Sequence, residues 1–166
     1  MSYDEVAESA YSQIIQRSDN GSMNALSERE LRALDDALDD EHKAWATYDQ
    51  VIEDFGPVRP FINIRESEFR HINALTNLYD RYGLVAPANP WIGKVPRYDS
   101  LQAACEAAVE AEIENVELYE RIMPASDRPE ILAVFRNLRD ASQQRHLAAF
   151  KRCANRYQRS GHRNNS

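Results

Sequence analysis

Residues 61–75 read FINIRESEFRHINAL, and the spacing of polar and apolar side chains in this stretch decides the fold. In a helix, residues three or four apart share a face, so the apolar residues of this stretch form one stripe. Glu68 and His71 lie midway along that stripe. An unpaired buried carboxylate costs several kcal/mol, and it normally pairs with another group or binds a metal. The rest of the chain therefore has to supply partners for this pair.

Two helices joined by a tight turn are predicted around this stretch. The helix that contains it covers residues 60–82, and Gly83 provides a left-handed C-terminal cap. The preceding helix covers residues 27–54, and Ser27 with Glu30 forms a capping-box pattern at its start.

The second half of the chain repeats this arrangement after a long connector. Residues 84–99 contain three prolines, which exclude a regular helix. Helices are predicted over about 100–123 and 127–153, the latter with a capping-box-like start at Asp127 and Glu130. No segment reads as a convincing strand.

These connection lengths predict an all-α fold. Two antiparallel helix hairpins separated by one long crossover form the ferritin-like variant of the four-helix bundle. We expect three parts: an N-terminal short helix and turn over residues 1–26, the bundle over 27–154, and a mobile polar tail over 155–166.

Every predicted bundle helix carries polar residues in the middle of its apolar stripe. The inward set comprises Glu41, Glu68, His71, Glu112 and His146. Three carboxylates and two imidazoles suit iron, manganese or zinc. The alternative is a buried layer of ion pairs and hydrogen bonds that sets the register of the helices without a metal.

Two residue spacings recur between the hairpins. Glu41 and Glu112 are 71 positions apart, as are Tyr48 and Tyr119; Glu68 and Gln143 are 75 apart, as are His71 and His146. Equal spacings of this kind predict that a pseudo-two-fold axis relates the two hairpins. A two-metal site in a helix bundle is built with this symmetry. The two tyrosines either serve the site, as electron carriers or hydrogen-bond donors to its ligands, or are ordinary core residues.

The sequence resembles the ferritin-like superfamily of di-iron carboxylate proteins over residues 27–153. The resemblance is carried by DDEHKAW, FINIRESEFRHINAL, LYDRYGL, VEAEIENVELY, VFRNLR and RHLAAF. More narrowly, the chain is similar to an uncharacterised ferritin-like group known only as a domain of unknown function. The resemblance implies one metal ligand on the first helix, a bridging acid and an imidazole on the second, a carboxylate on the third and an imidazole on the fourth. In that order these are Glu41, Glu68, His71, Glu112 and His146.

One position departs from the di-iron pattern. The fourth helix carries Gln143 three residues before His146, where the pattern has a glutamate. A glutamine does not bridge two cations as a carboxylate does. The departure favours a single metal or an asymmetric pair, so we expect one or two ions.

Composition limits the other function classes. The 166 residues suit one domain, and a net charge of −7 argues against nucleic acid as the main partner. No run of 18 apolar residues predicts a membrane span, and the N-terminus lacks signal-peptide features. We therefore expect a cytoplasmic protein.

The two cysteines, Cys105 and Cys153, form no C-x-x-C motif, which excludes a rubredoxin-type or zinc-ribbon module in this chain. In antiparallel helices, residues at one level have a constant sum of residue numbers. That sum is 258 for the cysteines and also for Glu112 with His146, which predicts that the cysteines face each other two turns from the site. They form a disulfide or thiol pair, or they are two small buried residues; a reducing cytoplasm favours the second interpretation.

The leading functional prediction is a metal-binding protein with a redox role. In this interpretation the chain is an iron-dependent oxidoreductase that oxidises Fe(II) or reduces peroxide or dioxygen. The alternative is a metal-free bundle that acts as a structural or partner-binding module. Such bundles often form homodimers, although the sequence does not indicate an interface.

Overall fold

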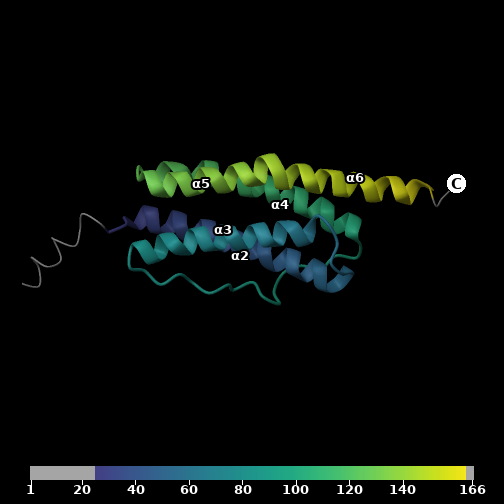
Figure 1. Cartoon of the computed structure of the whole chain (residues 1–166), viewed down its shortest axis with the longest axis horizontal. Helices are drawn as coiled ribbons and strands as arrows, with labels where there is room; N and C mark the ends of the chain where they lie inside the picture. Colours follow the sequence, from purple (N-terminus) through teal and green to yellow (C-terminus); the bar gives the residue numbers. More distant parts are fainter. Residues whose placement is uncertain (1–24, 164–166) are drawn as a thin grey trace, which may run out of the picture.

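The computed structural model describes residues 25–163, and over this range it consists of helices and loops without a strand (Figure 1). The helices pack into an elongated all-α bundle, which is compatible with the predicted ferritin-like arrangement. The predicted helix at 3–17 and its turn lie outside the described residues. The division into three parts stays a prediction.

The first hairpin consists of α2 (Glu28–Phe55) and α3 (Phe61–Arg81). The predicted capping box is confirmed: the Glu30 amide donates to Ser27 Oγ at 3.1 Å, and the Ser27 amide donates to Glu30 Oε2 at 2.9 Å. Gly83 follows α3 with φ of +69°, the left-handed conformation expected of a glycine cap.

The second hairpin consists of α4 (Leu101–Ile122), α5 (Pro129–Ala141) and α6 (Leu147–Arg163), with a π-helical turn, Ser142–His146, between the last two. The predicted capping box at Asp127 and Glu130 is wrong. The helix begins at Pro129 without a side-chain cap. Proline suits this position because its φ is already helical and its missing N–H would have no helical partner there.

The last helix is longer than predicted. It continues to Arg163, whereas the sequence predicted an end near Cys153 and a mobile tail. The physical reason is a continued apolar stripe: Tyr157, four residues beyond Cys153, packs against the core cluster that contains both cysteines. The far end of α6 extends beyond the other helices (Figure 1).

The long crossover runs along the outside of the bundle between α3 and α4 (Figure 1). Its polar side chains bind along α2: Asn89 Nδ2 donates to the His42 carbonyl at 3.1 Å, and Trp91 Nε1 donates to Asp39 Oδ1 at 2.9 Å. Arg97 pairs with Asp54 near the end of α2. The crossover is therefore attached to α2 by side-chain contacts along its course.

The core divides into two apolar clusters. One is built around Leu34, Leu38, Leu75, Tyr119 and Phe135, and the other around Tyr48, Phe61, Cys105, Phe150 and Cys153. Along each helix, the predicted site residues lie between the residues that belong to one cluster and those that belong to the other. Among the described helices, none combines the length and apolar character needed to cross a lipid bilayer.

Candidate metal centre

The structure brings the five predicted site residues together in one buried layer. Each is at most 7% exposed: Glu41 on α2, Glu68 and His71 on α3, Glu112 on α4, and His146 at the end of the π-helical turn. The neighbouring acids of α4, Glu110, Glu114 and Glu117, are exposed.

These side chains form two overlapping groups that share one carboxylate. Glu41, Glu68 and His71 form the first group, and Glu68, Glu112 and His146 form the second; within each, the ligand atoms lie within 4.8 Å of one another. His71 Nδ1 lies 3.1 Å from Glu41 Oε2 and 2.8 Å from Glu68 Oε2. His146 Nδ1 lies 3.1 Å from Glu68 Oε1 and 3.5 Å from Glu112 Oε2. Each group could hold a metal ion.

Ser67, one residue before the shared glutamate, contacts both imidazoles. Its Oγ lies 3.0 Å from His146 Nε2 and 3.4 Å from His71 Nε2, and the two rings stack with centroids 5.4 Å apart. When both Nε2 atoms carry hydrogens and donate to this hydroxyl, both Nδ1 lone pairs face the carboxylates. Metal-ligating histidines usually donate their second ring nitrogen in this way.

Tyr48 and Tyr119, which share the 71-residue spacing, each hydrogen-bond to a carboxylate of the opposite hairpin. Tyr119 on α4 donates to Glu41 Oε1 at 2.6 Å, and Tyr48 on α2 donates to Glu112 Oε1 at 2.7 Å. Burial and the neighbouring carboxylates raise the pKa of both hydroxyls, so they remain protonated donors. Of the two predicted interpretations, the geometry favours a role in holding the site.

Asn115 breaks this two-fold symmetry. Its Nδ2 donates to Asp40 Oδ2 at 2.7 Å and to Glu41 Oε1 at 3.2 Å. Burial and the charge of Glu41 raise the pKa of Asp40 to about 7, although the bond from Asn115 opposes the shift. The Glu41 side of the layer therefore carries a second carboxyl that the Glu112 side lacks.

The metal-free layer is held by shared protons. Burial opposes protonation of His71, but Glu41 and Glu68 outweigh burial and raise its pKa to about 10. Glu112 and Glu68 likewise raise the pKa of His146 to about 9. Burial and the charge of Glu68 raise the pKa of Glu41, whereas close contact with the His146 and His71 imidazoles overcomes burial and lowers the pKa of Glu68. Because metal binding must displace these protons, it depends on pH.

Several buried atoms of the layer are left without hydrogen bonds. Among the described residues, His146 Nδ1, Glu68 Oε2 and Ser142 Oγ have no partner of suitable hydrogen-bond geometry. Two of these atoms lie at ion-pair distance from a partner without hydrogen-bond geometry, and a water or an ion would satisfy such atoms. Once it has lost its proton, His146 Nδ1 beside carboxylates on two helices is a donor set that fits a divalent ion.

The structure corrects the interpretation of Gln143. The sequence placed this amide where a di-iron protein has its fourth carboxylate, but the side chain is exposed and outside the layer. The inward residue of the π-helical turn is Ser142, which is 1% exposed. π-helical turns inside α-helices frequently mark functional sites.

The predicted set of site residues did not include Ser67, Ser142 or Asn115. The signal for the two serines was available, because they are 75 positions apart, as are His71 and His146. No recurring spacing marks Asn115 in the same way. Its bond to Asp40 depends on the distance between α2 and α4, which no sequence spacing reports.

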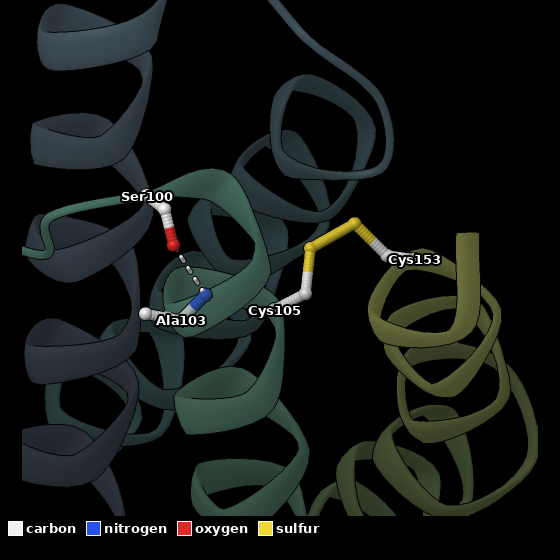
Figure 2. Close-up of a disulfide and its surroundings, with 4 residues drawn as sticks. All are labelled: Ser100, Ala103, Cys105 and Cys153. Atoms are coloured by element: carbon white, nitrogen blue, oxygen red, sulfur yellow. Dashed lines mark hydrogen bonds between the residues drawn. A yellow bond between two sulfur atoms is a disulfide. The ribbon is translucent and has the colours of Figure 1, made fainter. Parts of the chain in front are cut away.

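The cysteines form a disulfide. Cys105 on α4 and Cys153 on α6 are joined with their Cα atoms 5.8 Å apart, and both are buried (Figure 2). The predicted common level is confirmed, but the preference for two unpaired thiols is wrong. That preference came from the assumed compartment, and the cytoplasmic location stays a prediction. Ser100, the N-cap of α4, precedes Cys105 on the same helix. Its Oγ accepts a hydrogen bond from the Ala103 amide at 3.1 Å (Figure 2).

Comparisons with known proteins place the chain beside uncharacterised relatives. The family described as "Uncharacterized protein domain (DUF2202)" matches residues 30–163. A crystal structure of the hypothetical protein MJ0754 from Methanococcus jannaschii DSM 2661 is similar, with a TM-score of 0.71 and 24% identity over 80% of this chain and 83% of that one. This similarity shows the fold alone. No curated protein matches the chain.

Proposed function

This chain belongs to the DUF2202 family of uncharacterized protein domains, and from the chemistry of its buried layer we propose that it is a ferritin-like metalloprotein. The proposed ligands are Glu41, Glu68, His71, Glu112 and His146. Iron is the preferred metal, and manganese or zinc suits the same donor set.

Each of the two overlapping groups would hold one ion. Glu41 and His71 would bind the first ion, Glu112 and His146 the second, and Glu68 would bridge them. This division is supported by the position of Glu68, which has one oxygen near each imidazole, at 2.8 Å and 3.1 Å. Because the Gln143 side chain is exposed, the centre has three carboxylates and one bridge. We therefore propose an asymmetric pair of ions in which the second binds more weakly.

A bound iron pair would supply one-electron redox chemistry, and we propose Fe(II) oxidation or reduction of peroxide or dioxygen as the reaction class. The chain's own residues have three tasks. Ser67 keeps the imidazole Nδ1 atoms available to metal, and Tyr48 and Tyr119 hold the terminal carboxylates by hydrogen bonds. The two apolar clusters pack against the layer from both sides along the helices.

The observation that carries this proposal is the shared carboxylate between two stacked imidazoles. A layer that served only to fix helix register would need paired charges, and it would not need unpartnered donor atoms. Here His146 Nδ1 has no hydrogen bond of proper geometry within the described chain.

The test is metal content per chain, measured by elemental analysis after anaerobic loading with Fe(II) and, separately, with Mn(II). We expect up to two ions for the wild type and fewer for His71→Ala. His42→Ala is the matched control, because His42 is also buried on a bundle helix but belongs to neither group. Wild-type protein that binds no metal would contradict the proposal. Equal metal content in His71→Ala and wild type would also contradict it.

The second candidate is a metal-free bundle that acts as a structural or partner-binding module. The observation in its favour is that the protonated imidazoles pair with carboxylates without any metal, His71 with two of them. In that case His71→Ala would lower stability but would leave metal content at the background level of the wild type. A measured mass of one or two chains would exclude iron storage in a shell and would leave the homodimer as a candidate.

A further inference from the structure

A cavity connects the buried layer with the surface. Its volume is about 380 Å³, and it lies between α2, α4 and the crossover, with Pro96 and Tyr98 of the crossover in its wall. At its inner end it touches Glu68 and Glu112, which are otherwise at most 2% exposed. Glu41, His71 and His146 do not line it. The cavity therefore reaches the layer from the side of Glu112.

Small side chains keep this space open. Four alanines lie in the wall: Ala44 on α2, and Ala107, Ala108 and Ala111 on α4. A larger apolar residue at these positions would fill the space with its own side chain. The opening is therefore set by residues that have no chemistry of their own.

The cavity presents hydrogen-bond acceptors and negative charge. Asn115 is 5% exposed and lines the cavity, and its Oδ1 accepts no hydrogen bond from any residue that the structure describes. Asp40 lies beside it, and the exposed Glu110 and Glu114 stand at the rim. The cationic residue of the lining is Lys43, whose Nζ lies 5.1 Å over the ring of Trp91 on the crossover.

We propose that this cavity is the uptake site of the centre, where a hydrated divalent cation binds before it passes to Glu112 and Glu68. The proposal rests on the proposed function. Waters around a cation are hydrogen-bond donors, which is what Asn115 Oδ1 lacks, and the carboxylates of the lining attract the positive charge. An anion would be repelled by the acids, and a purely apolar molecule would leave the buried amide oxygen unsatisfied.

The size of the cavity suits this ligand. A shell of six waters occupies about 180 Å³ at about 30 Å³ per water, so a hydrated ion fits without expansion of the walls. The ion would exchange water for protein ligands at Glu112 first, because Glu41 and His71 lie outside the cavity. The shared Glu68 is the route from the second group to the first.

The first test narrows the cavity without touching a ligand. The double variant Ala107→Leu/Ala111→Leu is mixed anaerobically with Co(II), and binding is followed by the visible absorption of the bound ion in stopped flow. We expect uptake to slow severalfold while the final number of ions per chain stays at the wild-type value. An unchanged rate would overturn the proposal. If the final number itself falls, the variant has distorted the centre, and the charge variants described next decide.

The second test removes the rim charges. Glu110→Gln/Glu114→Gln should slow Co(II) uptake by about tenfold at low salt, and the difference should shrink as ionic strength rises. Glu106→Gln/Glu120→Gln is the matched control, since it removes two exposed acids from the same helix outside the cavity lining. Equal slowing in both pairs would show a general field effect and would overturn the uptake site. Wild-type protein that never binds Co(II) would instead refute the proposed function.

Discussion

Replacing Ser67 by alanine tests the reasoning about the imidazoles most directly. The Ser67 hydroxyl is the common partner of both Nε2 atoms, and its loss leaves each ring free to place its proton on Nδ1, the atom that faces the carboxylates. A neutral imidazole protonated on Nδ1 cannot bind metal through that atom. We expect Ser67→Ala to weaken metal binding while the five proposed ligands stay in place.

The size of the effect follows from the two contacts. The bond to His146 has an ordinary length of 3.0 Å, whereas the contact to His71, at 3.4 Å, is beyond the usual range. One ordinary hydrogen bond contributes about 1 kcal/mol, which is about fivefold in a dissociation constant. Removing the residue that hydrogen-bonds to a metal ligand typically lowers metal affinity by about 10- to 100-fold. We therefore expect about tenfold weaker binding at His146 and a smaller loss at His71.

The assay is a competitive titration of Co(II) against a chelator, for wild type, Ser67→Ala and Ser142→Ala. Ser142 is the matched control, because it occupies the corresponding position in the other hairpin, and its buried Oγ has no hydrogen-bond partner within the described residues. Ser142→Ala should change affinity less than Ser67→Ala. Equal losses in both variants, or no loss in Ser67→Ala, would refute the assigned role of this hydroxyl.

Three further predictions concern the stability of the metal-free protein. In chelator, its unfolding free energy in urea should fall as pH rises from about 6.5 to about 9. Folding raises the pKa values of His71 and His146. The stability that their protonated forms contribute is therefore complete below the pKa of the unfolded chain, and it is lost as pH rises through the pKa of the folded protein. An unfolding free energy that does not change with pH would contradict this. Tyr119→Phe should lower the unfolding free energy by about 1–3 kcal/mol, because a buried carboxylate loses a donor, and an unaltered urea midpoint would count against that bond. Reduction of the Cys105–Cys153 disulfide, which spans 48 positions, should cost about 4 kcal/mol in the loop-entropy account, whereas reductant should leave the stability of a Cys105→Ala/Cys153→Ala variant unchanged.

The sequence alone was sufficient to predict that the five proposed ligands of this layer face inward. The inward positions of Glu41, Glu68, His71, Glu112 and His146 follow from helical periodicity, which is a local property that residue spacing reports directly. The common level of the cysteines followed from the same arithmetic, because antiparallel helices advance at equal rates. Helix ends were predicted where a glycine or a serine cap marks them, and they were wrong at Pro129 and in α6, where packing of Tyr157 extends the helix.

The tertiary structure decided which atoms of this layer meet. Three features depend on distances between helices. They are the hydrogen bond from each tyrosine to the other hairpin, the position of Ser67 between two imidazoles, and the bond from Asn115 to Asp40. The outward direction of Gln143 depends on a local π-helical turn that shifts the register of the last helix. The cavity depends on how closely α4, with three alanines in the cavity wall, approaches α2. Periodicity places a residue on a face, but only packing sets its distance and angle to residues on another helix, and these determine its chemistry.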